Sequence, residues 1–309
     1  MSKIYKALEK AEREREAGSR KDIPSTTTRD EIKAWARKDI HPTTTRDEIK
    51  AWGKPKKSFA PTPVEGTFSE QQLVSFYQPK SLGAEQFRKL RTYLLQLNVQ
   101  GPPKTIMVTS ATSGEGKTFV SANLAAGFAR ELHAHALLVD CDLRVPSLAA
   151  SFGFSNGLGL SDYLRDSRKI ADLLLKTGIE KLSLLPGGNV PENPTELIGS
   201  KKMEDLVHEL KSRYNDRYII FDSTPLLATS ESEVLSKLVD GIIIVVKAGT
   251  TPRETVKQAI SSLEKEKILG FALNHLEFKS PGLHLRYFGS GGYYYQYGYE
   301  KKTSKHPKR

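Results

Sequence analysis

The stretch that decides the fold is Ser110-Ala111-Thr112-Ser113-Gly114-Glu115-Gly116-Lys117-Thr118. It follows an apolar, strand-like run at 105–109 and opens a helical pattern, which is the setting of a phosphate-binding P-loop. The backbone N–H groups of residues 113–118 can wrap a phosphate at the N-terminus of that helix, where the helix dipole favours negative charge. Glycines let the backbone come close, although Ala111 stands where the first glycine of the motif is usual. The stretch therefore predicts a nucleotide site.

The side chains of the loop predict the chemistry of that site. Lys117 is placed to reach the β- and γ-phosphates of ATP, and Thr118 is placed to hold Mg²⁺. ATP and Mg²⁺ are therefore the expected cofactors. The residues of this segment expected to contact ATP are Ser113, Gly114, Glu115, Gly116, Lys117, Thr118 and Phe119.

Carboxylates end two other apolar runs. Asp222 follows residues 218–221, and both Asp140 and Asp142 follow residues 136–139. The carboxyl ends of parallel strands face the same crevice as the P-loop, so we expect these groups beside the phosphates. An aspartate at a strand end is also a common turn residue. The predicted metal ligands are Thr118, Asp142 and Asp222.

Strand-like and helical patterns alternate between residues 68 and 285. The expected strands are 105–109, 136–139, 182–185, 218–221, 242–246 and 268–273. The expected helices include 84–97, 118–132, 202–213, 232–238 and 253–265. Continuously apolar strands separated by helices indicate a mostly parallel sheet that helices cover on both faces. We therefore predict an α/β fold of the P-loop NTPase class, formed by a domain at 68–285.

The positive charge of the chain, formally +11, lies at its two ends. Residues 1–60 carry 16 Lys and Arg against 10 Asp and Glu, and residues 301–309 carry five bases and no acid. The residues between them balance, with 26 bases and 26 acids. A balanced domain argues against a basic face that binds nucleic acid.

The sequence also indicates a compartment. Its single cysteine, Cys141, excludes an intrachain disulfide and fits a reducing environment. No secretory signal is visible, and the longest apolar run, 242–246, is far shorter than the ~20 residues that cross a bilayer. We therefore expect a cytoplasmic protein whose contact with a membrane is indirect, through a partner.

The two ends of the chain read differently from its middle. Residues 1–67 hold a charged helical pattern at 3–17 and a direct repeat, Thr-Thr-Thr-Arg-Asp-Glu-Ile-Lys-Ala-Trp, at 26–35 and 43–52. A duplicated disordered linker and a docking motif that uses the two tryptophans are both compatible with this repeat. Residues 286–309 form an expected flexible, basic tail with a tyrosine cluster. The cluster consists of Tyr293, Tyr294, Tyr295, Tyr297 and Tyr299.

Bacterial tyrosine kinases of capsule and exopolysaccharide systems carry two Walker-type motifs that resemble Ser-Gly-Glu-Gly-Lys-Thr-Phe-Val-Ser-Ala-Asn-Leu-Ala (113–125) and Val-Asp-Cys-Asp-Leu-Arg-Val-Pro (139–146). Further blocks similar to that family lie at 159–164, 186–197 and 222–225. The opening Ser-Lys-Ile-Tyr-Lys-Ala-Leu is similar to the start of a subgroup associated with exosortase-linked exopolysaccharide loci.

The resemblance implies a non-specific protein-tyrosine kinase that uses ATP. Such an autokinase phosphorylates in trans the tyrosine cluster of its own tail and regulates the synthesis and export of exopolysaccharide or capsule. The alternative is a partition-type ATPase switch without kinase activity. These ATPases share the sheet but usually carry a signature lysine at the position of Thr112, and they leave the tyrosine cluster unexplained.

Transfer to tyrosine places a demand on the carboxylates. A phenolic hydroxyl with a pKa of ~10 is barely ionised at neutral pH, so a carboxylate must take its proton. Asp140 and Asp142 are both candidates for this base, and the sequence does not distinguish which one acts and which supports the metal. The predicted catalytic residues are Lys117, Asp140 and Asp142.

The resemblance also implies partners. In the family, a helix with the spacing of Glu85, Arg88 and Arg91 helps subunits assemble into a ring, whereas the spacing alone favours an ion pair within the helix. Asn274 stands where related ATPases contact adenine, and an asparagine in a turn is an equal alternative. The family usually needs a membrane-spanning chain-length-determinant protein as activator, which would recruit the kinase to the inner face of the plasma membrane.

Overall fold

The computed structural model describes residue 68 and residues 72–97, 102–155, 157–166, 168–213 and 216–276. The expected helix at 3–17, the direct repeat and the five tail tyrosines lie outside the described residues. The expected boundaries of the domain, residues 68 and 285, therefore stay predictions.

A seven-stranded sheet in the order β3-β4-β2-β5-β1-β6-β7 forms the centre of the described chain. The six longer strands are all parallel, and the short β3 pairs with β4 in the antiparallel direction. The strands are β1 (Thr105–Ser110), β2 (His135–Asp140), β3 (Leu175–Lys176), β4 (Leu182–Leu185), β5 (Arg217–Asp222), β6 (Gly241–Lys247) and β7 (Ile268–Asn274).

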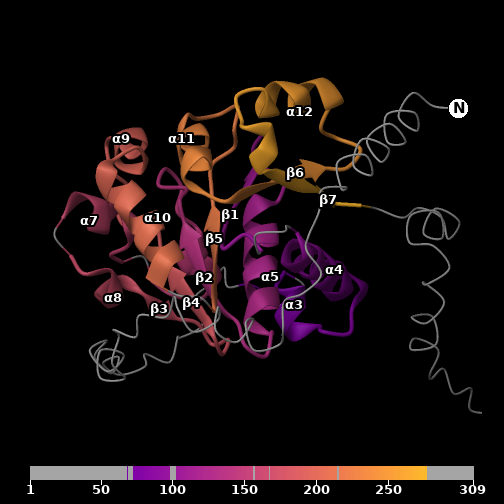
Figure 1. The fold of residues 1–309 in the computed structure, drawn as a ribbon, viewed down its shortest axis with the longest axis horizontal. Helices are drawn as coiled ribbons and strands as arrows, with labels where there is room; N and C mark the ends of the chain where they lie inside the picture. The colour runs from indigo at the N-terminus through magenta and orange to yellow at the C-terminus, as the bar shows by residue number, and fades with distance from the viewer. Residues whose placement is uncertain are drawn as a thin grey trace, which may run out of the picture. The chain divides into compact units, whose positions relative to one another are not determined.

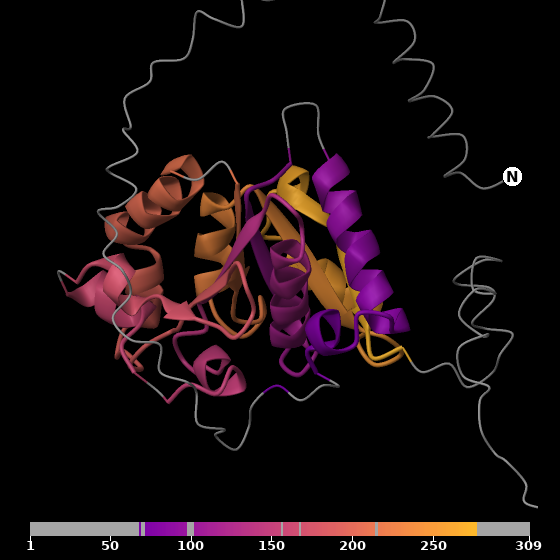
Figure 2. The ribbon, with the colours of Figure 1, turned by 90° about the horizontal axis from the view of Figure 1, so that it is seen from below.

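Helices cover both faces of this sheet, so the predicted α/β fold with a mostly parallel sheet is confirmed (Figures 1 and 2). One face carries α3 (Val74–Tyr77), α4 (Leu82–Gln96) and α5 (Lys117–Ala129). The other face carries α7 (Leu160–Arg165), α10 (Lys201–Arg213), α11 (Glu231–Leu238) and α12 (Arg253–Ile260). The remaining short helices are α6 (Leu148–Ser151), α8 (Ile170–Leu173), α9 (Pro194–Ile198) and the 3₁₀ turn η2 (Lys265–Lys267).

Two hydrophobic cores lie on the two faces of the sheet, because successive strand side chains point to opposite sides. In β1, Ile106 and Val108 join the core under α5, while Met107 joins the core under α10 and α11. The helix α5 is buried along most of its length, which its run of small residues permits. At its end, the ring of Phe128 stacks on Tyr218 of β5, with centroids 4.2 Å apart.

Local sequence signals explain where several helices begin. The side chain of Ser81 caps α4 by accepting a hydrogen bond from the N–H of Ala84, 3.1 Å away. Helix α9 starts with Pro194 in its first turn, where a missing N–H costs nothing. Within the described residues, no helix combines the length and the apolarity that crossing a bilayer requires.

All six predicted strands are present, each within one residue of its expected ends. The helix predicted at 253–265 was too long, because α12 ends at Ile260 and a turn leads to η2. The short elements β3, α3, α6, α7, α8 and α9 were not predicted, since segments of two to six residues carry too little periodicity.

We predict that Leu138→Ala lowers the free energy of unfolding by about 2–5 kcal/mol, because Leu138 is fully buried and a cavity remains. Urea unfolding of the full chain measures the change. The matched control is Leu132→Ala, because the side chain of Leu132 is 78% exposed and its loss should cost less than about 0.5 kcal/mol. Equal costs for the two variants would contradict the assignment of the core.

Candidate functional site

The P-loop joins β1 to α5, and two of its glycines adopt backbone angles that side chains resist. Gly114 has φ of 78° and Gly116 has φ of 92°, both in the left-handed region. At Gly116 there is also no room, because a Cβ atom would lie 2.0 Å from Nδ2 of Asn274. The loop conformation therefore depends on glycine at position 116 for two independent reasons.

Asn274, at the end of β7, holds the P-loop from the side. Its Nδ2 donates a hydrogen bond to the carbonyl oxygen of Glu115 over 2.9 Å. The structure thus joins two residues that are 159 positions apart in the chain. The sequence predicted either an adenine contact or a turn for Asn274. The hydrogen bond to Glu115 belongs to neither of these roles.

The side chain of Glu115 lies inside the P-loop and stabilises it through hydrogen bonds. It is 2% exposed, and its Oε2 accepts a hydrogen bond from the N–H of Thr112 at 2.8 Å. Its Oε1 accepts from the hydroxyl of Thr251 and, at 3.4 Å, from the N–H of Lys247. Glu115 therefore ties the P-loop to the end of β6, and any contact of this residue with a nucleotide is left to its backbone.

Asp140 and Asp222 lie opposite one another at the ends of the neighbouring strands β2 and β5. Both side chains are 1% exposed. The Oδ1 atom of Asp222 accepts a hydrogen bond from the hydroxyl of Ser121 at 2.9 Å, and its Oδ2 atom is buried without a hydrogen bond. Burial raises the pKa of Asp222 to about 6, with the charge of Lys117 acting in the opposite direction.

Asp140 is anchored by backbone donors. Its Oδ2 accepts hydrogen bonds from the N–H groups of Ser147 and Leu148, both at 3.0 Å, and its Oδ1 accepts from the N–H of Asp142 at 3.2 Å. Burial and the nearby charge of Asp222 raise the pKa of Asp140 to about 8, against the effect of those backbone donors. Asp140 shapes the loop after β2 and begins α6.

Asp142 is the more accessible member of the pair after β2. Its side chain is 15% exposed, and its Oδ2 lies 3.4 Å from Nζ of Lys117, which is equally exposed. Its Oδ1 accepts a hydrogen bond from the N–H of Val145 at 3.1 Å. The P-loop lysine and this carboxylate are thus paired at the carboxyl ends of the parallel strands.

A second loop covers Asp140 from outside. A Cβ atom at Gly187 would lie 2.6 Å from Cβ of Pro146 and 3.6 Å from Cγ of Asp140. Asp162 holds this loop by accepting hydrogen bonds from Nδ2 of Asn189 at 2.8 Å and from the N–H of Asn189 at 3.2 Å. The family-like blocks at 159–164 and 186–197 are therefore clamped to one another beside the second Walker-type motif.

Arg144 completes that motif without reaching into the crevice. Its Nε donates to Oε1 of Glu231 at the start of α11, over 2.8 Å. Glu231 is 2% exposed, while half of the Arg144 side chain is exposed. This ion pair joins the loop after β2 to the helix after β5.

The structure places Lys117 beside Asp142, and Asp140 opposite Asp222, while the roles expected for these residues stay predictions. It places the ring of Phe119 against Phe87 of α4, with centroids 5.7 Å apart. The partly buried side chain of Phe119 packs against the core on the face of the sheet that α5 covers. Its expected contact with ATP stays a prediction.

The three α4 residues form contacts within the chain. Nε of Arg88 donates to Oε2 of Glu85 at 2.7 Å, and its NH1 donates to the carbonyl oxygen of Pro79 at 2.6 Å. Arg91 reaches across to α5, where its NH1 donates to the carbonyl oxygen of Gly127 at 2.7 Å. The pairing of Glu85 with Arg88 is the one that their spacing favours. A role of these residues between subunits remains a prediction.

Some residues of the site had no sequence signal of their own. Ser121 lies one turn inside α5 and binds Asp222, and Thr251 lies after β6 and binds Glu115. Both are hydroxyl residues in positions where serine and threonine are common, so only the fold reveals them.

We predict that Asp222→Asn raises the free energy of unfolding at pH 8 by on the order of 1 kcal/mol when nucleotide and Mg²⁺ are absent. The folded-state pKa of about 6 lies above the ordinary value of 3.8, so ionisation costs stability as the pH rises through this window. The gain should therefore shrink as the pH is lowered from 8 to 5. Urea unfolding in the presence of a chelator at both pH values measures it.

The control for this variant is Asp205→Asn on α10, whose side chain is 64% exposed and pairs with Lys201. Asp205→Asn should change the free energy of unfolding by less than about 0.5 kcal/mol at both pH values. A gain for Asp222→Asn that did not change with pH, or a loss at pH 8, would contradict the electrostatic account.

The chain is similar to several known proteins. Residues 103–269 match the family model described as "AAA domain". Tyrosine-protein kinase YwqD of Bacillus subtilis is 34% identical over 211 residues, which cover 68% of this chain and 88% of that protein. Putative tyrosine-protein kinase CapB of Staphylococcus aureus is 30% identical over 223 residues, which cover 72% of this chain and 92% of that protein.

The fold agrees as well. The crystal structure of the chimerical protein CapA2B2 is 30% identical and superposes with a TM-score of 0.63, covering 70% of this chain and 95% of that one. The chain is thus similar over most of its length to proteins whose names state a tyrosine kinase activity. The chain belongs to the family of bacterial tyrosine-protein kinases.

Proposed function

We propose that this tyrosine kinase transfers the γ-phosphoryl group of ATP to tyrosines in the C-terminal segment of a neighbouring copy. The observation that carries the proposal is the pairing of Lys117 with the accessible Asp142, beside the buried carboxylates of Asp140 and Asp222. A lysine that binds phosphates and a carboxylate that takes a proton are the two groups that such a transfer requires.

In the proposed reaction, the phenolic oxygen of a tyrosine bonds to the γ-phosphorus while the bond from that phosphorus to the β,γ-bridging oxygen breaks. The N–H groups of the P-loop and Lys117 hold the phosphates and stabilise the charge that collects on the leaving ADP. The phenolic proton passes to Asp142, because Asp140 is 1% exposed and its oxygens are occupied by backbone donors. The products are ADP and a phosphotyrosine.

The residues present fit Mg²⁺. Asp222 offers a buried carboxylate oxygen, and Thr118, in the first turn of α5, is close enough to Asp222 to lower the pKa of that carboxyl. Magnesium prefers oxygen ligands and keeps several waters, so two protein groups suffice when phosphates supply the rest. When bound, the ion would draw charge from the β- and γ-phosphates, and Asp222, Thr118 and Asp142 are its proposed ligands.

The wider role follows from the family. We propose that phosphorylation of Tyr293, Tyr294, Tyr295, Tyr297 and Tyr299 controls the synthesis and export of an exopolysaccharide or capsule. A membrane-spanning chain-length-determinant protein is the proposed activator, which recruits the kinase to the inner face of the plasma membrane. The family resemblance and the tyrosine-rich C-terminal sequence support this proposal. A partition-type ATPase switch would leave that sequence without a purpose.

The test for transfer between copies uses two variants. One is Lys117→Met with its tyrosines intact, and the other keeps Lys117 but carries phenylalanine at the five tail tyrosines. Incubation of the mixture with labelled ATP and the activator should label the Lys117→Met chain. Neither variant alone should gain label on its tail.

Two results would count against the proposal. Label that appears on wild-type tails but never on the Lys117→Met chain in the mixture would mean transfer within one chain. Released phosphate without label on any tyrosine would favour the ATPase switch.

We further predict that Glu85→Ala and Arg88→Ala reduce the mass of the assembled, unphosphorylated protein, because α4 is the proposed contact in a ring. The fold should tolerate both changes, since a partly exposed i,i+3 ion pair contributes less than about 1 kcal/mol. Light scattering after size-exclusion chromatography measures the mass.

Glu254→Ala is the matched control, because Glu254 forms an exposed i,i+3 pair with Lys257 on α12. This variant should retain the mass of the wild type. An unchanged mass in the α4 variants would confine Glu85 and Arg88 to their contacts within the chain.

A further inference from the structure

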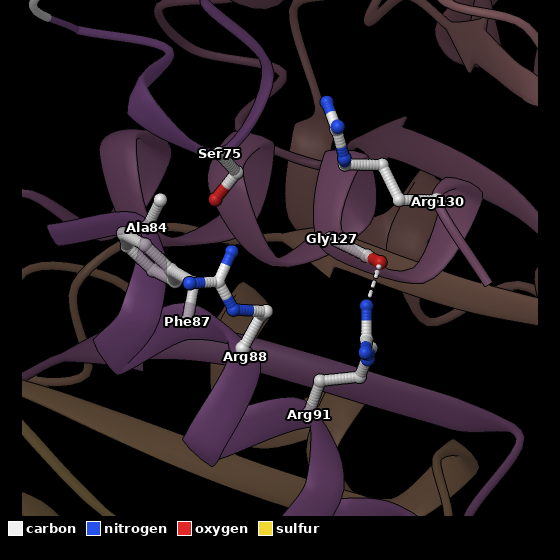
Figure 3. A pocket seen from close by; sticks show the side chains of 7 residues that line it. All are labelled: Ser75, Ala84, Phe87, Arg88, Arg91, Gly127 and Arg130. Atoms are coloured by element: carbon white, nitrogen blue, oxygen red, sulfur yellow. Dashed lines mark hydrogen bonds between the residues drawn. The ribbon is translucent and has the colours of Figure 1, made fainter. Parts of the chain in front are cut away.

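A small pocket lies between α3, α4 and α5, on the face of the sheet that carries these helices. Seven residues line it: Ser75, Ala84, Phe87, Arg88, Arg91, Gly127 and Arg130. Figure 3 shows the guanidinium of Arg88 and the hydroxyl of Ser75 pointing toward one another across it, with Arg91 bound to Gly127 at one side. No part of the transfer reaction proposed above uses this pocket.

Two buried donors in the pocket have no hydrogen-bond partner among the described residues. The first is the hydroxyl of Ser75, a residue that is only 5% exposed. The second is Nε of Arg91, whose other two nitrogens bind the carbonyl oxygen of Gly127 and, at 2.6 Å, the carboxylate of Glu131. A buried donor without a partner costs stability, so a ligand that accepts both hydrogen bonds would regain it.

The position of Ser75 is fixed before any ligand arrives. Its N–H donates to Oδ1 of Asn123 in α5 over 2.9 Å, and Nδ2 of Asn123 donates to the carbonyl oxygens of Gln72 and Phe119. The hydroxyl is therefore presented by a backbone that α5 holds in place. Such preorganisation lowers the cost of binding.

The charges of the residues that line the pocket favour the binding of an anion. Three guanidinium groups line the pocket and no carboxylate does. Glu85 and Glu131 pair with Arg88 and Arg91 from outside the lining. Arg130 donates to the carbonyl oxygen of Phe76 at 3.4 Å and has no carboxylate partner in the described part of the chain, so one positive charge remains in excess.

We propose that this pocket binds a phosphate monoester, specifically a phosphotyrosine from the C-terminal segment of a copy of this chain. Clusters of arginine are the usual means by which proteins bind phosphorylated residues, since guanidinium donors match phosphate oxygens. Phe87 adds an apolar wall suited to an aryl group. The source of the phosphotyrosine rests on the proposed function, whereas the anion site itself does not.

The consequence is a link between product and assembly. The pocket includes Arg88 and Arg91, two of the three residues proposed to hold the ring together. A phosphotyrosine bound there occupies the α4 surface that a neighbouring subunit would need. Phosphorylated tails would then separate subunits by competing for a surface, in addition to any repulsion between their charges.

The test uses a synthetic peptide of residues 289–299 that carries one phosphate on Tyr295, together with its unphosphorylated form and inorganic phosphate. The protein is the full chain, treated with a phosphatase and saturated with ADP and Mg²⁺ so that the P-loop is occupied. Calorimetry or fluorescence anisotropy measures binding. The phosphopeptide should bind more tightly than either of the other two probes.

Three variants locate the binding. Arg91→Gln should weaken the phosphopeptide about tenfold or more, and Ser75→Ala should weaken it several-fold, because each removes a donor to a charged acceptor. Arg168→Gln is the charge-matched control, and it should leave affinity unchanged, since Arg168 is an exposed residue between α7 and α8. The melting temperature of Ser75→Ala should not fall, because its hydroxyl has no partner to lose.

The outcomes separate the possibilities. If Ser75→Ala and Arg91→Gln both leave the affinity for the phosphopeptide unchanged, the proposed site is wrong. A different result is that inorganic phosphate binds as tightly as the phosphopeptide and is weakened by both variants. That result would overturn the assignment to phosphotyrosine, and the pocket would be a site for the free anion. Because the peptide is synthetic, failure of the chain to phosphorylate itself would not affect any of these measurements.

Discussion

Two carboxylates, those of Asp140 and Asp222, lie opposite one another at the ends of neighbouring strands and are almost completely shielded from water. Ionised carboxylates in such a position raise the energy of the folded chain unless positive charge or donors compensate. The backbone donors around Asp140 and the hydroxyl of Ser121 provide part of that compensation. The part of the negative charge that these groups do not compensate attracts cations to the edge of the sheet where the P-loop begins.

Much of the surrounding architecture keeps those groups in place. Asp140 binds the N–H groups that start α6, and Gly187 permits a second loop to pack over it. Arg144 and Glu231 join the loops that follow β2 and β5. These contacts limit how far the two strand ends can separate, which matters because a chemical step that depends on position loses rate with small displacements.

The sequence predicted the parts of this structure that depend on short, repeated patterns. Continuous apolar runs located six strands, and the P-loop with its strand-end aspartates placed the crevice. Contacts between distant segments were out of reach, such as the amide of Asn274 on the P-loop or the hydroxyl of Thr251 on Glu115, because no local pattern records them. The end of α12 was misplaced for a related reason: the polar residues after Ile260 are compatible with helix, and only packing decides.

The surface of α4 illustrates how one set of residues can serve two purposes. Glu85 and Arg88 pair along the helix, and Arg91 fastens the helix to α5. Partly exposed ion pairs are exchanged at little cost, so the same guanidinium groups are available to a neighbouring subunit or to an anion. The sequence alone could not distinguish a contact within the chain, a contact between subunits and an anion site. Each of these uses arginine at the same positions.

The strand β7 has a mechanical implication. Its last residue, Asn274, both fills the space left by Gly116 and bonds to the carbonyl of Glu115, and the described chain ends two residues later, at Leu276. β7 also pairs along its length with β6, and Glu115 ties the end of β6 to the same loop, so two sets of contacts connect this strand to the P-loop. A displacement of β7 would therefore be transmitted to the backbone of the P-loop without passing through any helix.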